Sequence, residues 1–183
     1  VLGMRGDLEF VGHLTDDQGW RVEIKGYPRL TEVGAWREQT LVGHMSGDEE
    51  SWTFDGVRHG GSYSQEELKG LVEYARRRGI MIVPEIDLPG HMQAAVAAYP
   101  ELGNFPEQQV GVREVWGISD HVLGVSDQVF DFLRDVLTQV AGIFPAPYVH
   151  IGGDECPTGE WERSSQARAR MNEWGLTRVS EIQ

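Results

Sequence analysis

Apolar positions along this chain follow two different periodicities in turn. Leu68, Leu71, Val72 and Ala75 recur at helical spacing, whereas the run Ile80–Val83 is continuously apolar. The first pattern predicts a helix with one buried face. The second is typical of a strand that is buried on both faces, as parallel strands are.

The helix carries recognisable signals at both of its ends. Ser64 and Glu67 have the Ser-x-x-Glu spacing of a capping box, and three arginines at 76–78 precede Gly79. A capping box begins a helix, cations suit its last turn, and glycine commonly follows its end. The sequence therefore predicts a helix over 64–78 that leads directly into a strand.

The same order recurs towards the C-terminus. We expect Asp127 to cap a second helix, which Pro145 and Pro147 end, and Tyr148–Ile151 to form another short buried strand. The buried stripe of that helix is predicted to be Phe130, Leu133, Val136 or Leu137, Val140 and Phe144. A third helix is expected from about Glu160 to Trp174, ending at Gly175.

Alternating strands and helices indicate an α/β fold, with a further strand near Leu8–Leu14. The links that follow the strands are long, from Thr15 to Tyr63 and from Asp87 to Ser126, with a short helical piece near Gln93–Tyr99. Long loops after the strands carry the active site of a (β/α)8 TIM barrel. Such a barrel takes ~250 residues, so we expect residues 1–183, with about three to four βα units, to be one part of a barrel.

Composition excludes several classes of partner and site. The net charge is −13, from 29 acidic and 16 basic residues, so neither nucleic acid nor an anionic membrane is an expected partner. A single cysteine, Cys156, excludes an internal disulfide and a paired-cysteine zinc site. The chain does not begin with Met and shows no signal peptide, so we expect the true start upstream, and the compartment and oligomeric state stay open.

Carboxylates and a histidine follow each of the three expected strands, in the segments 13–20, 84–91 and 150–155. Asp154 and Glu155 are adjacent, so their side chains point in different directions, and their like charges raise one pKa towards that of a general acid. Acids at the start of a helix are the alternative interpretation of this pair. With its neighbours considered, we favour a catalytic pair.

His91 and Asp16 are candidates to tune that pair, in a relay Asp16–His91–Glu155. A histidine at a helix start and an Asp-Asp-Gln-Gly turn are the structural alternatives. His13 and His150 lie in apolar runs, where a buried, hydrogen-bonded structural histidine is at least as good an interpretation as a catalytic one. Tryptophans stack on sugar rings in acidic clefts, but most of the six here are expected to serve packing.

These three segments resemble glycoside hydrolase family 20, the β-N-acetylhexosaminidases. The resemblance is carried by His-Leu-Thr-Asp-Asp-Gln-Gly-Trp-Arg at 13–21, Pro-Glu-Ile-Asp-Leu-Pro-Gly-His at 84–91 and His-Ile-Gly-Gly-Asp-Glu at 150–155. It extends over about residues 10–162. It implies a TIM barrel that removes terminal, non-reducing β-linked N-acetylglucosamine or N-acetylgalactosamine.

The resemblance also implies a mechanism and a set of site residues. The 2-acetamido oxygen of the substrate replaces the usual carboxylate nucleophile and forms an oxazolinium intermediate, with retention. Asp154 would orient the acetamido group, Glu155 would be the general acid and base, and His91 and Asp16 would tune Glu155. The expected substrate-binding residues are His150, His13, Asp17 and Trp116. The implied ligand is an N-acetylhexosamine-terminated oligosaccharide or glycoconjugate, and no metal or cofactor is expected.

The chain departs from the family at three places, and one of them is that the later half of the barrel, with the rest of the sugar pocket, has no match in residues 1–183. Val11 stands where the family has the first histidine of His-x-His, and Arg5 is no convincing match for the sugar-gripping arginine of the first strand. A non-catalytic carbohydrate-binding or interaction protein is therefore one alternative. A metal-dependent hydrolase using His13, His91, His150 and Asp154 is a weaker one, because Val11 breaks the ligand spacing. The preferred hexosamine and linkage stay open.

Overall fold

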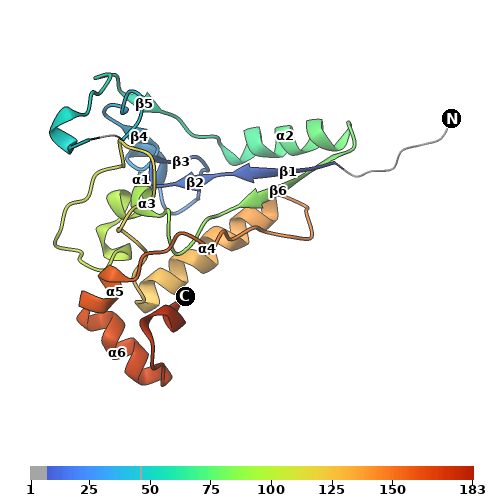
Figure 1. Cartoon of the computed structure of the whole chain (residues 1–183). Coiled ribbons are helices and arrows are strands. Elements are labelled where there is room, and N and C mark those ends of the chain that lie inside the picture. Colours follow the sequence, from blue (N-terminus) through green and yellow to red (C-terminus); the bar gives the residue numbers. More distant parts are fainter. Residues whose placement is uncertain (1–7, 46) are drawn as a thin grey trace.

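Two parallel strands lie side by side in the computed structural model, which describes residues 8–45 and 47–183 (Figure 1). β1 (Leu8–His13) pairs with β6 (Ile80–Glu85) so that His13 lies opposite Glu85. The crossover between them contains α2 (Gln65–Arg76), as a βαβ unit requires. The predicted α/β class is confirmed, and the described residues form part of a barrel without closing one. Arg5 lies outside the described residues.

The predicted start of α2 is confirmed in detail. The Ser64 hydroxyl accepts a hydrogen bond from the Glu67 amide at 3.2 Å, and the Glu67 carboxylate accepts one from the Ser64 amide at 2.7 Å. Gly79 follows the helix with a φ of 70°, which suits glycine. β6 then begins at the predicted residue and continues to Glu85.

α4 (Asp127–Ile143) corrects two expectations. Its N-cap is Ser126, whose hydroxyl accepts from the Val129 amide, and Asp127 is the first helical residue instead. The buried stripe also lies on a slightly different face. Its buried members are Val129, Phe132, Val136, Val140 and Ile143. Phe130 is 39% exposed and packs against Trp174, because the helix turns Phe132 towards the aromatic rings of Trp20 and Tyr27.

The prediction that Tyr148–Ile151 forms a buried strand is wrong, because the segment pairs at only one residue. It makes one parallel bridge, between His150 and Glu85, and its apolar side chains are exposed. The ladder cannot continue towards Tyr148, because the next bond would need an amide hydrogen that Pro84 lacks. In the other direction Gly152, with a φ of 61°, turns the chain out of the extended conformation.

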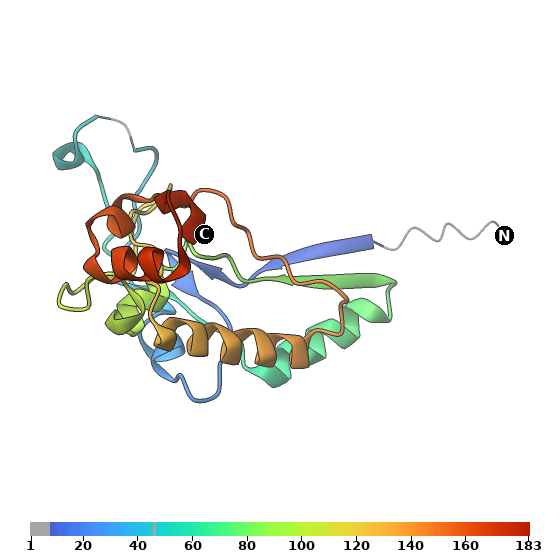
Figure 2. The same ribbon diagram turned by 90° about the horizontal axis from the view of Figure 1, so that it is seen from below.

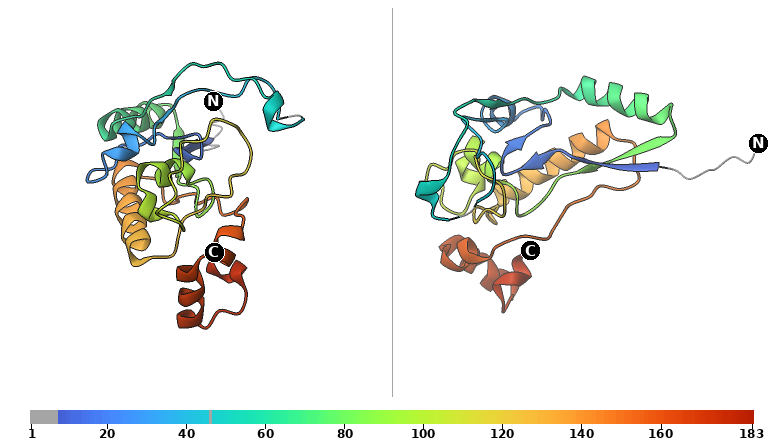
Figure 3. Two further views of the ribbon diagram at one scale, coloured as in Figure 1. Left: turned by 90° about the vertical axis from the view of Figure 1, so that its left-hand side faces the viewer. Right: turned by 45° about the horizontal axis from the view of Figure 1, so that its top comes forward.

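The third predicted helix is divided in two. α5 (Gly159–Arg163) and α6 (Ser165–Trp174) are separated at Ser164, whose hydroxyl caps α6 by accepting from the Ala167 amide. Gly175 ends α6 in the left-handed conformation, as predicted. The three views in Figures 1 and 3 show α5 and α6 as a group at one end of the molecule.

Short elements fill the two long loops after the strands. The first loop contains β2 (Thr15–Asp16), β3 (Gly19–Trp20), α1 (Arg29–Glu32), β4 (Trp36–Arg37), η1 (Glu49–Ser51) and β5 (His59–Gly60). The second contains the predicted α3 (Gln93–Ala98) and η2 (Pro100–Leu102), and η3 (Val179–Ile182) lies near the C-terminus. The pairs β2–β3 and β4–β5 are antiparallel and were not predicted.

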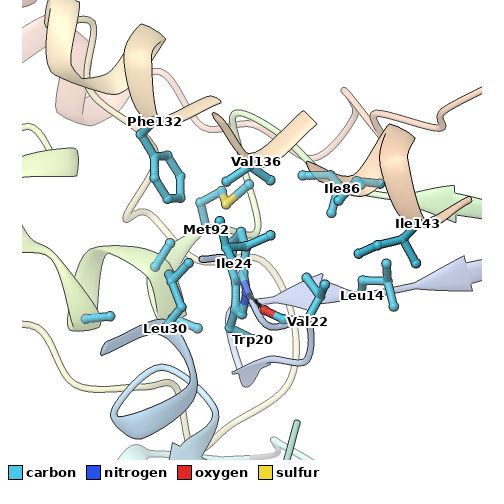
Figure 4. Packing of buried hydrophobic residues seen from close by; sticks show 14 of the residues in the cluster. Leu14, Trp20, Val22, Ile24, Leu30, Ile86, Met92, Phe132, Val136 and Ile143 are labelled. Carbon is cyan, nitrogen blue, oxygen red and sulfur yellow. Dashed lines mark hydrogen bonds between the residues drawn. The ribbon is translucent and has the colours of Figure 1, made fainter. Parts of the chain in front are cut away.

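The hydrophobic core joins the first long loop to α4. Figure 4 shows Trp20, Val22 and Ile24 facing Phe132 and Val136, and the Trp20 indole donates a 2.6 Å hydrogen bond to the Val22 carbonyl. α2 and α4 lie along the same side of the strand pair (Figure 2). This core holds the strand ends, and the loops that follow them, in fixed positions. Among the described residues, no helix has both the length and the apolar character needed to cross a membrane.

Candidate active site

The carboxyl ends of the strands bring the three predicted segments together. The Leu14 amide donates to the Glu85 carbonyl at 3.2 Å, and the Ile86 amide donates to the His150 carbonyl at 3.0 Å. The side chains that follow these residues therefore share one edge, as in a barrel enzyme.

His91 and Glu155 meet at this edge. Their side chains are joined by a 3.1 Å hydrogen bond between Nε2 and Oε2. His91 is largely buried, whereas Glu155 and its neighbour Asp154 are exposed and open to a ligand. Gly90 allows the close approach of these segments, since a Cβ there would lie 3.0 Å from the Glu155 carbonyl oxygen.

Two aspartates lie behind the His91 ring. Its Nδ1 is 3.4 Å from Asp16 Oδ1 and 3.2 Å from Asp17 Oδ2, which are ion-pair distances. Among the described residues, His91 Nδ1 and Asp17 Oδ2 have no hydrogen bond of good geometry. Burial lowers the pKa of His91, but Asp17 and the Glu155 hydrogen bond outweigh it, so the net pKa is raised. The ring is thus disposed to carry a proton beside Glu155.

Asp17 is fully buried rather than open to a ligand. Its Oδ1 accepts from the Gln93 amide at 3.0 Å, and burial raises its pKa. The structure therefore places Asp17 beside Asp16 as a second partner of His91.

Asp16 is held from its other side by His13. His13 Nε2 lies 3.2 Å from Asp16 Oδ2, and His13 Nδ1 lies 2.8 Å from Glu85 Oε2. Burial raises the pKa of Asp16, but hydrogen bonds from His13 and from the Asp17 amide outweigh it and lower the pKa overall. His150 reaches the same Glu85, with its Nδ1 2.8 Å from Oε1. Neither histidine is buried, contrary to the structural alternative.

Comparison with known proteins assigns the chain to a family. The family model described as "Glycosyl hydrolase family 20, catalytic domain" matches residues 9–183. The chain belongs to this family. A β-hexosaminidase of Porphyromonas gingivalis is 44% identical over all of this chain, and one of Vibrio furnissii is 42% identical over 95% of it.

Solved structures of the family show the same fold. A β-N-acetylhexosaminidase crystal structure superposes with a TM-score of 0.85 at 38% identity, over 95% of this chain and 35% of that one. The exo-β-N-acetylglucosaminidase of Vibrio harveyi in complex with N-acetylglucosamine superposes with a TM-score of 0.77 at 41% identity. The match covers 96% of this chain and 27% of that one. The chain spans only 22% of the length of the Porphyromonas gingivalis relative and 28% of the length of the Vibrio furnissii relative.

Sequence reasoning missed several residues of this candidate site. Asp87 is buried, accepts from the Gly153 amide at 3.4 Å and donates its own amide to the Thr15 hydroxyl at 3.0 Å. Burial raises the pKa of Asp87. Its position two residues after the end of β6 was the signal in the sequence that could have identified it.

Two arginines were also missed. They are Arg21 and Arg37, which line a hollow of about 190 Å³ together with His13 and Asp16. Arg21 donates to the carbonyls of Ala35 and Gly61, so it also ties two parts of the first long loop together. A larger hollow, of about 470 Å³, lies at the opposite end of β6, away from the site.

Trp116 lies on the second long loop and is about half exposed. Its indole donates to the Gly43 carbonyl at 3.4 Å and its ring meets His44 edge-on. The loop is tied to the site through the Arg113 amide, which donates to the Asp17 carbonyl. Trp116 therefore packs against residues 43–44 of the first long loop, and these contacts do not include the His91–Glu155 pair.

Two sets of side chains have the spacing of metal ligands: His13, Glu85 and Asp87, and Asp16, Asp17 and His91. Several of these atoms are already paired with one another, so we assign no metal to them. Cys156 is half-buried, and burial beside Asp87 raises the pKa of its thiol to about 11. The thiol is therefore protonated at neutral pH.

Proposed function

We propose that this chain supplies the catalytic pair of a β-N-acetylhexosaminidase that acts with retention through substrate assistance. The observation that carries the proposal is the Glu155–His91 hydrogen bond backed by Asp16 and Asp17, within a family 20 catalytic domain. The substrate class follows from the names of the relatives and from the N-acetylglucosamine bound by the Vibrio harveyi enzyme.

In the first step the acetamido oxygen of the substrate attacks the anomeric carbon, and the bond to the leaving oxygen breaks. Glu155 gives its proton to that oxygen, and Asp154 holds the acetamido N–H while positive charge develops on the group. In the second step the Glu155 carboxylate takes a proton from water, which attacks the anomeric carbon and reopens the oxazolinium ring.

The roles of the remaining residues follow from their positions. We assign Asp16, Asp17 and His91 to the orientation and protonation of Glu155. Asp17 is buried, so we place it with His91 and not in contact with the sugar. We keep His150 and Trp116 as candidates for contact with the substrate, because both side chains are exposed.

The test is hydrolysis of p-nitrophenyl β-N-acetylglucosaminide and β-N-acetylgalactosaminide by the full-length protein. Glu155→Gln and Asp154→Asn are each expected to lower kcat by about 10²–10⁴-fold, the range for loss of a positioned proton donor or charge partner. Glu66→Gln is the matched control, since Glu66 is exposed on α2 and pairs only locally with Lys69. Sugar binding without hydrolysis by the wild-type protein would favour the non-catalytic alternative.

Substrate assistance has its own test. Successive fluorination of the acetamido methyl group makes its oxygen less nucleophilic, so kcat should fall at each step. The corresponding β-glucoside, which lacks the acetamido group, should not be hydrolysed. Equal rates across the fluorinated series would contradict this mechanism.

A further inference from the structure

An unbroken series of polar contacts leads from His150 to Asp16. Glu85 is its centre, with Oε1 2.8 Å from His150 Nδ1 and Oε2 2.8 Å from His13 Nδ1. The other nitrogen of His13 lies 3.2 Å from Asp16 Oδ2. These residues come from the ends of β1 and β6, from β2 and from the 148–151 segment, so the contacts tie these parts to one another.

Asp16 connects this series to the proposed general acid. Its Oδ2 faces His13, and its Oδ1 faces His91 Nδ1 at 3.4 Å. The far nitrogen of His91 bonds to Glu155. The rotation of the Asp16 carboxylate therefore decides whether His91 Nδ1 faces Asp16 in addition to Asp17.

We propose that His13 and Glu85 are positioning residues for Glu155: Glu85 fixes the His13 ring, and the ring holds Asp16 in the rotation that faces His91. This inference rests on the proposed function, and it replaces direct substrate binding as the role of His13. Both ring nitrogens of His13 face carboxylates, so neither is free for a sugar hydroxyl. An imidazole donates from both nitrogens only when it is protonated.

The electrostatics agree with that arrangement. The hydrogen bond to Asp16, supported by Glu85 and opposed by burial, raises the pKa of His13 to about 9. His13 is therefore a cation through the neutral range, and Asp16 beside it stays ionised.

Titratable and charged groups surround His13 on every neighbouring segment. They are Glu85 and Asp87 at the end of β6, Asp16 on β2, His150 on the 148–151 segment, and Arg21 and Arg37, which line the same hollow. Both arginines make hydrogen bonds to backbone carbonyls of the first loop, whereas Glu85 and Asp16 bond directly to the ring. The acids therefore dominate the surroundings of His13.

Two substitutions separate the two contacts of the ring. An asparagine amide reaches about as far as Nδ1, so His13→Asn keeps a donor for Glu85 and loses the one for Asp16. A glutamine amide reaches about as far as Nε2, so His13→Gln keeps the donor for Asp16. Equal melting temperatures of the variants and of Glu66→Gln would establish that each is folded.

The first readout is kcat/KM against pH for the full-length protein with p-nitrophenyl β-N-acetylglucosaminide. Without the cation, Asp16 takes up a proton at higher pH and stops supporting His91. The acid limb of His13→Asn should therefore move up by about one pH unit, the lower end of the effect of a nearby opposite charge. His13→Gln should move less, and a profile unchanged in both variants would overturn the inference.

The second readout does not depend on hydrolysis. In the full-length protein labelled with [13Cε1]-histidine, the signal that is missing from His13→Asn belongs to His13. It should titrate with a midpoint near pH 9 in the wild-type protein. A midpoint near 6.5 would overturn the inference whether or not the enzyme is active, whereas a wild-type protein that fails to hydrolyse the substrate would overturn the proposed function.

Discussion

His91 and Glu155, which share the hydrogen bond at the centre of the site, both have positive φ angles, of 53° and 47°. Side chains other than glycine rarely adopt this conformation, and each instance costs about 1–3 kcal/mol. The strain persists because the surrounding contacts determine it, among them the close approach of Gly90 to Glu155. Strained residues of this kind gather at functional sites, which agrees with the role we propose.

Gly152 provides a test at the same scale. A Cβ at this position would lie 1.8 Å from Asp87 Oδ1, on a backbone with a φ of 61°. We expect Gly152→Ala to lower the free energy of unfolding by about 2–4 kcal/mol through overpacking and backbone strain. It should also displace Asp154 and Glu155 and so reduce kcat.

Gly142→Ala is the matched control for that measurement. Gly142 is an exposed residue of α4 with open space around its Cα, so alanine should raise stability by up to about 1 kcal/mol. Both variants are compared by denaturant unfolding of the full-length protein. If the two substitutions have the same effect, the contact between Gly152 and Asp87 does not limit the site.

At the scale of elements, the side of α4 that faces the core is the most informative feature. Phe132 is 1% exposed and its ring contacts Trp20 and Tyr27, whereas Phe130 is 39% exposed. We expect Phe132→Ala to cost about 3–5 kcal/mol, the range for a buried aromatic side chain. Phe130→Ala should cost clearly less. Thermal unfolding of the two variants would show the reverse order if the stripe predicted from the sequence were the buried one.

The 148–151 segment shows how one residue limits an element. Its apolar residues suggest a strand, but strand pairing also depends on the neighbour. Pro84 cannot donate the bond that Tyr148 needs, and Gly152 turns the chain away. The bridge that remains, between His150 and Glu85, is the one that aligns two site residues.

At the scale of the whole molecule, exposed apolar side chains gather on the strands. Leu8 and Phe10 of β1 are 66% and 60% exposed, and Tyr148 and Ile151 are exposed as well. β1 has β6 on one side and, among the described residues, no strand on the other. Unpaired strand edges with apolar side chains favour association.

We therefore expect residues 1–183, produced alone, to self-associate and to bind a hydrophobic dye. Light scattering and dye fluorescence would measure this, with Phe10→Lys as a variant that should reduce both signals. Glu66→Lys, on exposed α2, is the control for the added charge. A monomeric chain with a sharp melt and no dye binding would show that these faces are protected in another way.

Much of the candidate site could be inferred from the sequence because strand ends converge in a parallel sheet. The segments containing Asp16 and His91 follow β1 and β6, the segment containing Glu155 follows the His150–Glu85 bridge, and the structure brings the three side chains together. Glu85 and Asp87 were missed, because a sequence does not show that Glu85 contacts two histidines or that Asp87 packs against Gly152. Such contacts join residues far apart along the chain.

The sequence by itself determined the α/β class, the capping box of α2 and the order of the site segments, since these depend on local periodicity and on short motifs. Only the tertiary structure decided which face of α4 is buried, where α5 ends and how far the 148–151 segment pairs. It also decided that Asp17 lies behind His91 and that His13 faces two carboxylates. These features depend on packing and hydrogen bonds between distant residues, whose energies are set by three-dimensional neighbours and not by adjacent ones.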